Sequence, residues 1–105
     1  MRIHTRAAIL LATYNGMPYL EAQVASLRAQ TCQDFTVVVR DDGSNDETRT
    51  FLAHTATTWP ERFIVLPDDG ERLGPCLNFA RLLHEVEAPF YFFADQDDVW
   101  EPTKV

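Results

Sequence analysis

Uninterrupted apolar runs alternate along this chain with segments of helical periodicity, and this alternation leaves few possible folds. The runs are short, rich in branched or aromatic residues and bounded by polar turns, as expected of strands buried on both faces. They comprise residues 7–12, 35–39, 63–66 and 90–94. Such strands, joined by helices, form a parallel sheet with helices on both faces. The sequence therefore predicts an α/β, Rossmann-like fold with the order β-α-β-α-β-α-β.

The first helix is expected after the turn that follows residues 7–12. Pro18 suits a first helical turn, where its missing N–H costs nothing. Leu20, Val24 and Leu27 then recur at the spacing of one helical face. We expect this helix to fade near Thr31.

The second and third helices are expected after the second and third apolar runs. Ser44 and Glu47 stand in capping-box spacing, which predicts a helix start near Asn45. Residues 55–60 are interpreted as the loop that follows this helix. Gly74-Pro75 opens the third helix.

Polar clusters follow three of the predicted strands. They are Thr13-Tyr14-Asn15, Asp41-Asp42-Gly43-Ser44 and Asp95-Gln96-Asp97-Asp98. Parallel sheets of this type bind ligands beyond the carboxyl ends of their strands. We therefore expect clusters that are distant in sequence to form one functional site at a common rim.

The aspartates after the last apolar run indicate the chemistry of that site. Asp95, Asp97 and Asp98 lie within four positions of one another and would repel each other without a counterion. An all-oxygen set of ligands suits a hard cation such as Mg²⁺ or Mn²⁺, which commonly holds phosphates. Simpler interpretations stay open at this point: a solvated acidic turn here, a turn and helix cap at 41–44, and a core aromatic at Tyr14.

Composition narrows the class of protein. The 105 residues form one domain or part of one, and a net charge of −7 argues against a nucleic-acid partner. Cys32 and Cys76 have no metal-ligand spacing and are expected to be reduced, partly buried thiols. His4, His54 and His84 also lack ligand spacing and are expected at the surface or on helix faces. Trp59 and Trp100 are interpreted as packing residues.

The motifs together resemble the amino-terminal half of a family 2 glycosyltransferase, a family with the GT-A fold. The matching segments are 11–16, Gln30-Thr31, 40–46, Leu73-Gly74, 78–81 and 95–100. The resemblance covers residues 7–104. It implies that residues 1–6 are an amino-terminal extension and that 7–105 are a nucleotide-sugar-binding half-domain, truncated before the acceptor half.

The resemblance implies transfer of a sugar from a nucleotide-diphosphate donor, with Mg²⁺ or Mn²⁺ bridging the diphosphate. Donor-binding residues would be Thr13, Tyr14, Asn15, Asp41, Asp42 and Asp95. Tyr14 would lie against the base, and Asp42 would hydrogen-bond the base or ribose. Asp95 would contact the ribose or support the metal site without ligating the ion itself. Asp97 or Asp98 would ligate the metal.

The same resemblance leads us to expect no catalytic residue within this chain, because the family's general base lies downstream of Val105. The chain should therefore bind donor without catalysing transfer alone. Within the family, the motifs resemble a bacterial subset that builds O-antigen and other polysaccharides and includes rhamnosyltransferases. This resemblance implies a UDP- or dTDP-sugar as donor and a saccharide or lipid-linked acceptor. The implied transfer is inverting. The implied location is cytoplasmic, or peripheral at the inner membrane.

Two other functions stay open on the sequence. The first is a stand-alone nucleotide-binding or regulatory module that catalyses no reaction. The second is a structural half-domain that pairs with another chain. The truncation that the resemblance implies would uncover a sheet edge and apolar helix faces, which favours a homo-oligomer.

Overall fold

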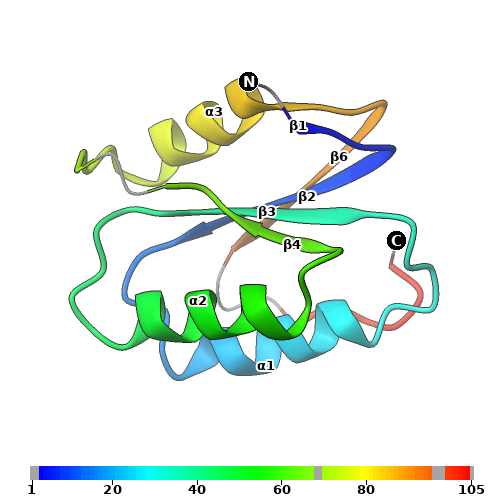
Figure 1. Cartoon of the computed structure of the whole chain (residues 1–105), viewed down its shortest axis with the longest axis horizontal. Coiled ribbons are helices and arrows are strands. Elements are labelled where there is room, and N and C mark those ends of the chain that lie inside the picture. The colour runs from blue at the N-terminus through cyan, green and yellow to red at the C-terminus, as the bar shows by residue number, and fades with distance from the viewer. Residues whose placement is uncertain (1–2, 68–69, 96–98, 105) are drawn as a thin grey trace.

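A four-stranded parallel sheet forms the centre of the computed structural model, which describes residues 3–67, 70–95 and 99–104 (Figure 1). The strands are β2 (Ala7–Thr13), β3 (Thr36–Asp41), β4 (Phe63–Val65) and β6 (Phe90–Asp95). They lie in the order β4-β3-β2-β6, with every neighbouring pair parallel. The predicted parallel sheet is confirmed.

Helices cover both faces of this sheet, as predicted. Helices α1 (Tyr19–Arg28) and α2 (Thr48–Thr58) lie side by side on one face, and α3 (Pro75–Glu85) lies on the other (Figure 1). The strand side chains alternate between the two faces. Ile9 and Leu11 pack with the α1 and α2 side, whereas Leu10 packs with Leu82 of α3.

A second, two-stranded sheet was not predicted. Strand β1 (Ile3–His4) pairs in parallel with β5 (Val86–Glu87), which directly follows α3. Residues 3 and 4, expected as part of an extension, therefore contact the remainder of the fold. Strands of two residues are too short to give a periodic signal in sequence.

The predicted capping box of α2 is wrong. The helix begins at Thr48, and its N-terminal residue Glu47 makes no side-chain capping hydrogen bond. The Ser44 hydroxyl instead bonds the Asp41 carboxylate and accepts the backbone N–H of Asn15. A nearby carboxylate and a neighbouring loop thus compete with the helix for Ser44, and Asp46 Oδ1 accepts the Thr48 N–H at 2.9 Å.

The predicted loop at 55–60 is wrong as well, because α2 continues to Thr58. Its last turn contains several threonines, which have low intrinsic helix propensity. Trp59 is nonetheless buried, with its ring 6.1 Å from that of Phe35 and 6.0 Å from that of Phe63. This packing holds the end of the helix on the sheet and outweighs propensity.

Of the remaining expectations about side chains, some are confirmed and one is wrong. Trp59 and Trp100 are buried and the histidines are exposed, as predicted. Cys32 and Cys76 are free but exposed, so the expectation of partly buried thiols is wrong. Among residues 3–67, 70–95 and 99–104, no helix has the length and apolarity needed to cross a membrane.

Candidate functional site

The order of the strands creates a switch point at the centre of the sheet. From β2 the chain adds β3 and β4 on one side and then returns to place β6 on the other side of β2. At the carboxyl end, Ala12 pairs with Asp95 across this switch point and Thr13 pairs with Asp41. Crevices for ligands form at such points in open α/β sheets.

Hydrogen bonds join the first two predicted clusters into one rigid rim. The Thr13 hydroxyl donates to Asp41 Oδ1 at 2.8 Å, and the Asn15 backbone N–H donates to Ser44 Oγ at 2.8 Å. In return, the backbone N–H of Asn45 donates to Asn15 Oδ1 at 2.8 Å. Asn15 itself adopts a φ of 47°, which suits an asparagine in a tight turn. The loops at 13–15 and 41–45 are therefore in contact, as predicted from the sequence.

Asp41 and Asp42 diverge, although they are adjacent in sequence. Asp41 bonds towards the loop that precedes α2, whereas Asp42 accepts the backbone N–H groups of Leu73 and Gly74 at 2.7 and 2.9 Å. Asp42 is only 3% exposed and also bonds Arg40 Nη1 at 3.1 Å. The carboxylate of Asp42 therefore ties the end of β3 to the start of α3.

The charge state of Asp42 follows from these contacts. Burial raises the pKa of Asp42, but the N–H groups of Leu73 and Gly74 and the Arg40 guanidinium together hold that pKa below its ordinary value. Arg40 is also buried and donates to Asn78 Oδ1 at 3.1 Å, while Asn78 Nδ2 donates back to the Arg40 carbonyl. The ionised carboxylate is thus part of a connected buried network.

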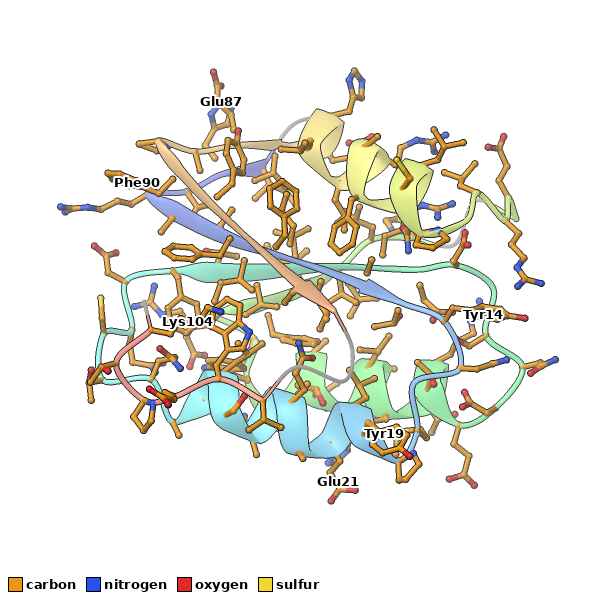
Figure 2. The ribbon with its side chains drawn as sticks, turned by 180° about the vertical axis from the view of Figure 1, so that it is seen from behind. Tyr14, Tyr19, Glu21, Glu87, Phe90 and Lys104 are labelled. Atoms are coloured by element: carbon orange, nitrogen blue, oxygen red, sulfur yellow. The ribbon has the colours of Figure 1, made fainter. Side chains whose placement is uncertain are left out.

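Tyr14 lies at the rim beside a cation that the sequence analysis missed. The Arg72 guanidinium carbon lies 3.9 Å from the centre of the Tyr14 ring, while Leu73 and Gly74, the next two residues, bind Asp42. Figure 2 shows Tyr14 at the end of the sheet opposite Phe90 and Lys104. Tyr14, Asp42 and the segment at 72–74 thus form one wall of the rim.

The predicted metal ligands Asp97 and Asp98 lie outside the described residues, as does the side chain of Asp95. The backbone of Asp95 ends β6 directly beside Ala12, so the aspartate run starts at the switch point. Within the described part of the chain, no cluster of His, Cys, Asp and Glu could hold a metal. The ligand assignments for the metal and for the donor stay predictions.

Several residues of the rim gave no separate signal in sequence. Arg72 lies between two glycines in a non-periodic stretch, so nothing predicted its position over Tyr14. Arg40 looked like the polar end of a strand, yet it is buried on Asp42 and Asn78. Successive side chains of an extended strand point to opposite faces of the sheet. If β3 had been predicted to extend to Asp41, this rule would have placed the side chains of Asp41 and Asp42 on opposite sides.

Comparison with known sequences identifies relatives of this chain. The dTDP-rhamnosyl transferase RfbG of Shigella flexneri is 33% identical over 98 residues, which are 90% of this chain and 34% of RfbG. The teichoic acid poly(glycerol phosphate) polymerase of Staphylococcus epidermidis is 30% identical over 95 residues, 89% of this chain and 13% of the polymerase. The chain thus spans about a third of the length of RfbG and a smaller part of the polymerase.

Solved structures share this fold. TarS 1-349 of S. aureus in complex with UDP-GlcNAc superposes with a TM-score of 0.80 at 26% identity, over 92% of this chain and 28% of that one. The mannosyltransferase PcManGT of Pyrobaculum calidifontis, in complex with GDP-Man and Mn²⁺, gives 0.81 at 26% identity, over 92% and 29%. The architecture is therefore that of GT-A glycosyltransferases.

The sequence model of the family described as "Glycosyl transferase family 2" matches residues 8–105. This match includes the switch point, the rim that joins 13–16 to 41–48, and the segment at 72–74. The chain belongs to glycosyltransferase family 2.

Proposed function

We propose that this chain is the donor-binding part of a metal-dependent glycosyltransferase that acts on a UDP- or dTDP-sugar. The observation that carries the proposal is the switch point, where the Tyr14 loop, the Asp42 wall and the start of the aspartate run meet. The likeness to structures solved with UDP-GlcNAc and with GDP-Man supports a nucleotide-sugar ligand.

The donor set of the proposed metal site suits Mg²⁺ or Mn²⁺, because Asp97 and Asp98 offer only carboxylate oxygens. When bound, such an ion stabilises the negative charge that develops on a nucleoside diphosphate leaving group. The residues of this chain would bind and orient the donor. Asp95, at the end of β6, would contact the ribose from the same edge.

The nucleoside is proposed to lie against Tyr14. Replacing Tyr14 with alanine should weaken UDP binding about tenfold or more, since stacking on an aromatic ring contributes about 1–3 kcal/mol per base. Tyr14→Phe should bind as the parent does, because it keeps the ring. Isothermal titration calorimetry measures both, with Tyr19→Ala as the matched control, since Tyr19 is 66% exposed on α1. Equal affinities for Tyr14→Ala and the parent would remove Tyr14 from the site.

The acceptor and the general base are proposed to lie in other parts of a longer protein, because RfbG is about three times as long as this chain and the teichoic acid polymerase is longer still. The acceptor would be a bacterial polysaccharide or a lipid-linked saccharide, as the relation to RfbG suggests, with transfer of a hexosyl or rhamnosyl group and inversion. A cytoplasmic location, or attachment to the inner membrane, belongs to the same proposal. The chain alone would bind donor without transferring it.

Calorimetry with UDP, dTDP and GDP, each with and without Mn²⁺, tests the proposal. We expect UDP or dTDP to bind with an affinity that Mn²⁺ raises, and GDP to bind more weakly than either. A nucleotide affinity that is the same with and without Mn²⁺ would instead indicate a nucleotide-binding module without the metal site. No binding of any nucleotide would indicate a structural half-domain. Release of sugar from a donor by this chain would contradict its proposed inactivity.

Self-association through β6 is a further expectation. Strand β4 has three residues followed by Pro67, whereas β6 has six, with Phe90 62% exposed and Phe93 52% exposed. A long edge that is apolar up to Asp95 and contains no proline invites pairing with another strand. Light scattering should show a dimer that Phe93→Lys converts to monomer, whereas Tyr19→Lys should not. A monomeric parent chain would contradict this expectation.

A further inference from the structure

The chain beyond the aspartate run lies along α1 (Figure 2). Trp100 is 5% exposed, and its ring centroid lies 6.0 Å from that of Phe92 in β6. The Trp100 backbone N–H donates to Ser26 Oγ at 3.0 Å. The polypeptide is therefore held in the core two residues after Asp98.

Gln30 provides a second anchor for the same segment. Its Nε2 donates to the Glu101 carbonyl at 2.7 Å, across 71 residues of sequence, and the side chain is buried. The neighbouring Thr31 donates its backbone N–H to the Pro102 carbonyl at 2.7 Å and its hydroxyl to the same oxygen at 3.1 Å. Two consecutive residues thus hold two consecutive carbonyls.

A purely local role does not account for this geometry. At the end of α1, the backbone N–H of Ala29 donates to the Ala25 carbonyl and the backbone N–H of Gln30 donates to the Leu27 carbonyl. Gln30 also donates to the Ser26 carbonyl, but at 3.3 Å, which is longer than its 2.7 Å bond to Glu101. The shorter bond is the one that crosses to the segment after the aspartate run.

We propose that Gln30, supported by Ser26 and Thr31, is a positioning residue for the aspartate run. This inference rests on the proposed function. The upstream end of the run is fixed by the pairing of Asp95 with Ala12, and Gln30 fixes the downstream end through Glu101. A short span held at both ends has less conformational entropy to lose when its carboxylates bind a cation. Gln30 would thereby raise the affinity for the divalent ion from the opposite end of α1.

The test compares Gln30→Met with Gln33→Met. Methionine keeps the size of glutamine and tolerates burial, but it cannot donate a hydrogen bond. Gln33 is the matched control, because its side chain donates to the carbonyls of Arg28 and Gln30, which are close to it in sequence. Free Mn²⁺, measured by electron paramagnetic resonance at saturating UDP, gives the affinity for the ion.

We expect Gln30→Met to weaken Mn²⁺ binding about tenfold, which corresponds to about 1.4 kcal/mol, because backbone that the hydrogen bond restrained must then be ordered when the ion binds. Its affinity for UDP in EDTA should stay within about twofold of the parent's. Gln33→Met should match the parent in both measurements. Parental Mn²⁺ affinity in Gln30→Met would overturn the inference, as would equal losses of UDP affinity with and without the metal.

Hydrogen exchange separates this inference from the proposed function. In the absence of any ligand, Gln30→Met should speed exchange of the Thr31 and Trp100 amides, and Gln33→Met should not. If the parent chain binds neither UDP nor dTDP, the proposed function fails, and exchange alone then decides on the anchor. Unchanged exchange in Gln30→Met would show that Gln30 does not hold the segment.

Discussion

Replacing Asp42 with alanine is expected to lower the free energy of unfolding by about 3 kcal/mol. The change removes a carboxylate that accepts the backbone N–H groups of Leu73 and Gly74 and pairs with Arg40, at 3% exposure. Breaking a buried ion pair from one side leaves polar groups desolvated, which typically costs about 3–5 kcal/mol. Urea denaturation followed by circular dichroism measures the loss.

A matched control for Asp42 lies on the surface. Asp34 pairs with Arg6 at 3.4 Å, but its side chain is 58% exposed, so Asp34→Ala should change stability by less than about 1 kcal/mol. Similar losses for Asp42→Ala and Asp34→Ala would show that the buried network contributes no special stability.

The stability contributed by Asp42 should also depend on pH. Its pKa in the folded protein lies below the ordinary value of 3.8, so the folded state binds fewer protons than the unfolded state. The contribution is therefore complete above about pH 5 and declines as the pH falls through 3.8 towards the lower, folded pKa. Asp42→Asn should flatten this part of the acid unfolding profile. A profile as steep as the parent's would assign the acid sensitivity to other carboxylates.

Replacing both Asp97 and Asp98 with asparagine is expected to weaken Mn²⁺ binding in the presence of UDP by at least about 100-fold. Losing residues that only orient a ligand costs about 10–100-fold, so losing both proposed carboxylate ligands should cost more. Calorimetry should show that UDP binding no longer responds to Mn²⁺, while its affinity in EDTA is unchanged. The control replaces Asp68 and Asp69, another pair of adjacent aspartates, with asparagine. In this control, UDP binding should still respond to Mn²⁺. Full dependence on Mn²⁺ in the first variant would show that other residues ligate the metal.

The arrangement of strands and the common rim could be predicted from sequence because each depends on a local pattern. The apolar runs defined the strands, and a parallel sheet necessarily brings their carboxyl ends to one edge. Structure then showed that β3 extends to Asp41, which turns Asp41 and Asp42 to opposite sides. The prediction had treated the two aspartates as one cluster with one role.

Features that depend on distant contacts could not be predicted. Arg72 lies over Tyr14 only because the segment before α3 returns to the rim, and Gln30 finds its partner 71 residues away. Ser44 matched a helix-capping pattern but bonds Asp41 and Asn15, which the fold places nearer. In each case a tertiary contact determined the role of a side chain whose local pattern was silent or indicated another role.

Paramagnetic broadening by Mn²⁺ in the presence of UDP is the most direct measurement of where the donor binds. If the diphosphate binds through a divalent ion at the switch point, amide signals of Thr13, Tyr14 and Val99 should broaden. Signals of Arg6 and Asp34, at the amino ends of the strands, should stay sharp, and Mg²⁺ should broaden none. Broadening at Arg6 and Asp34, or broadening at the rim that UDP does not affect, would contradict a nucleotide site at the carboxyl edge of this sheet.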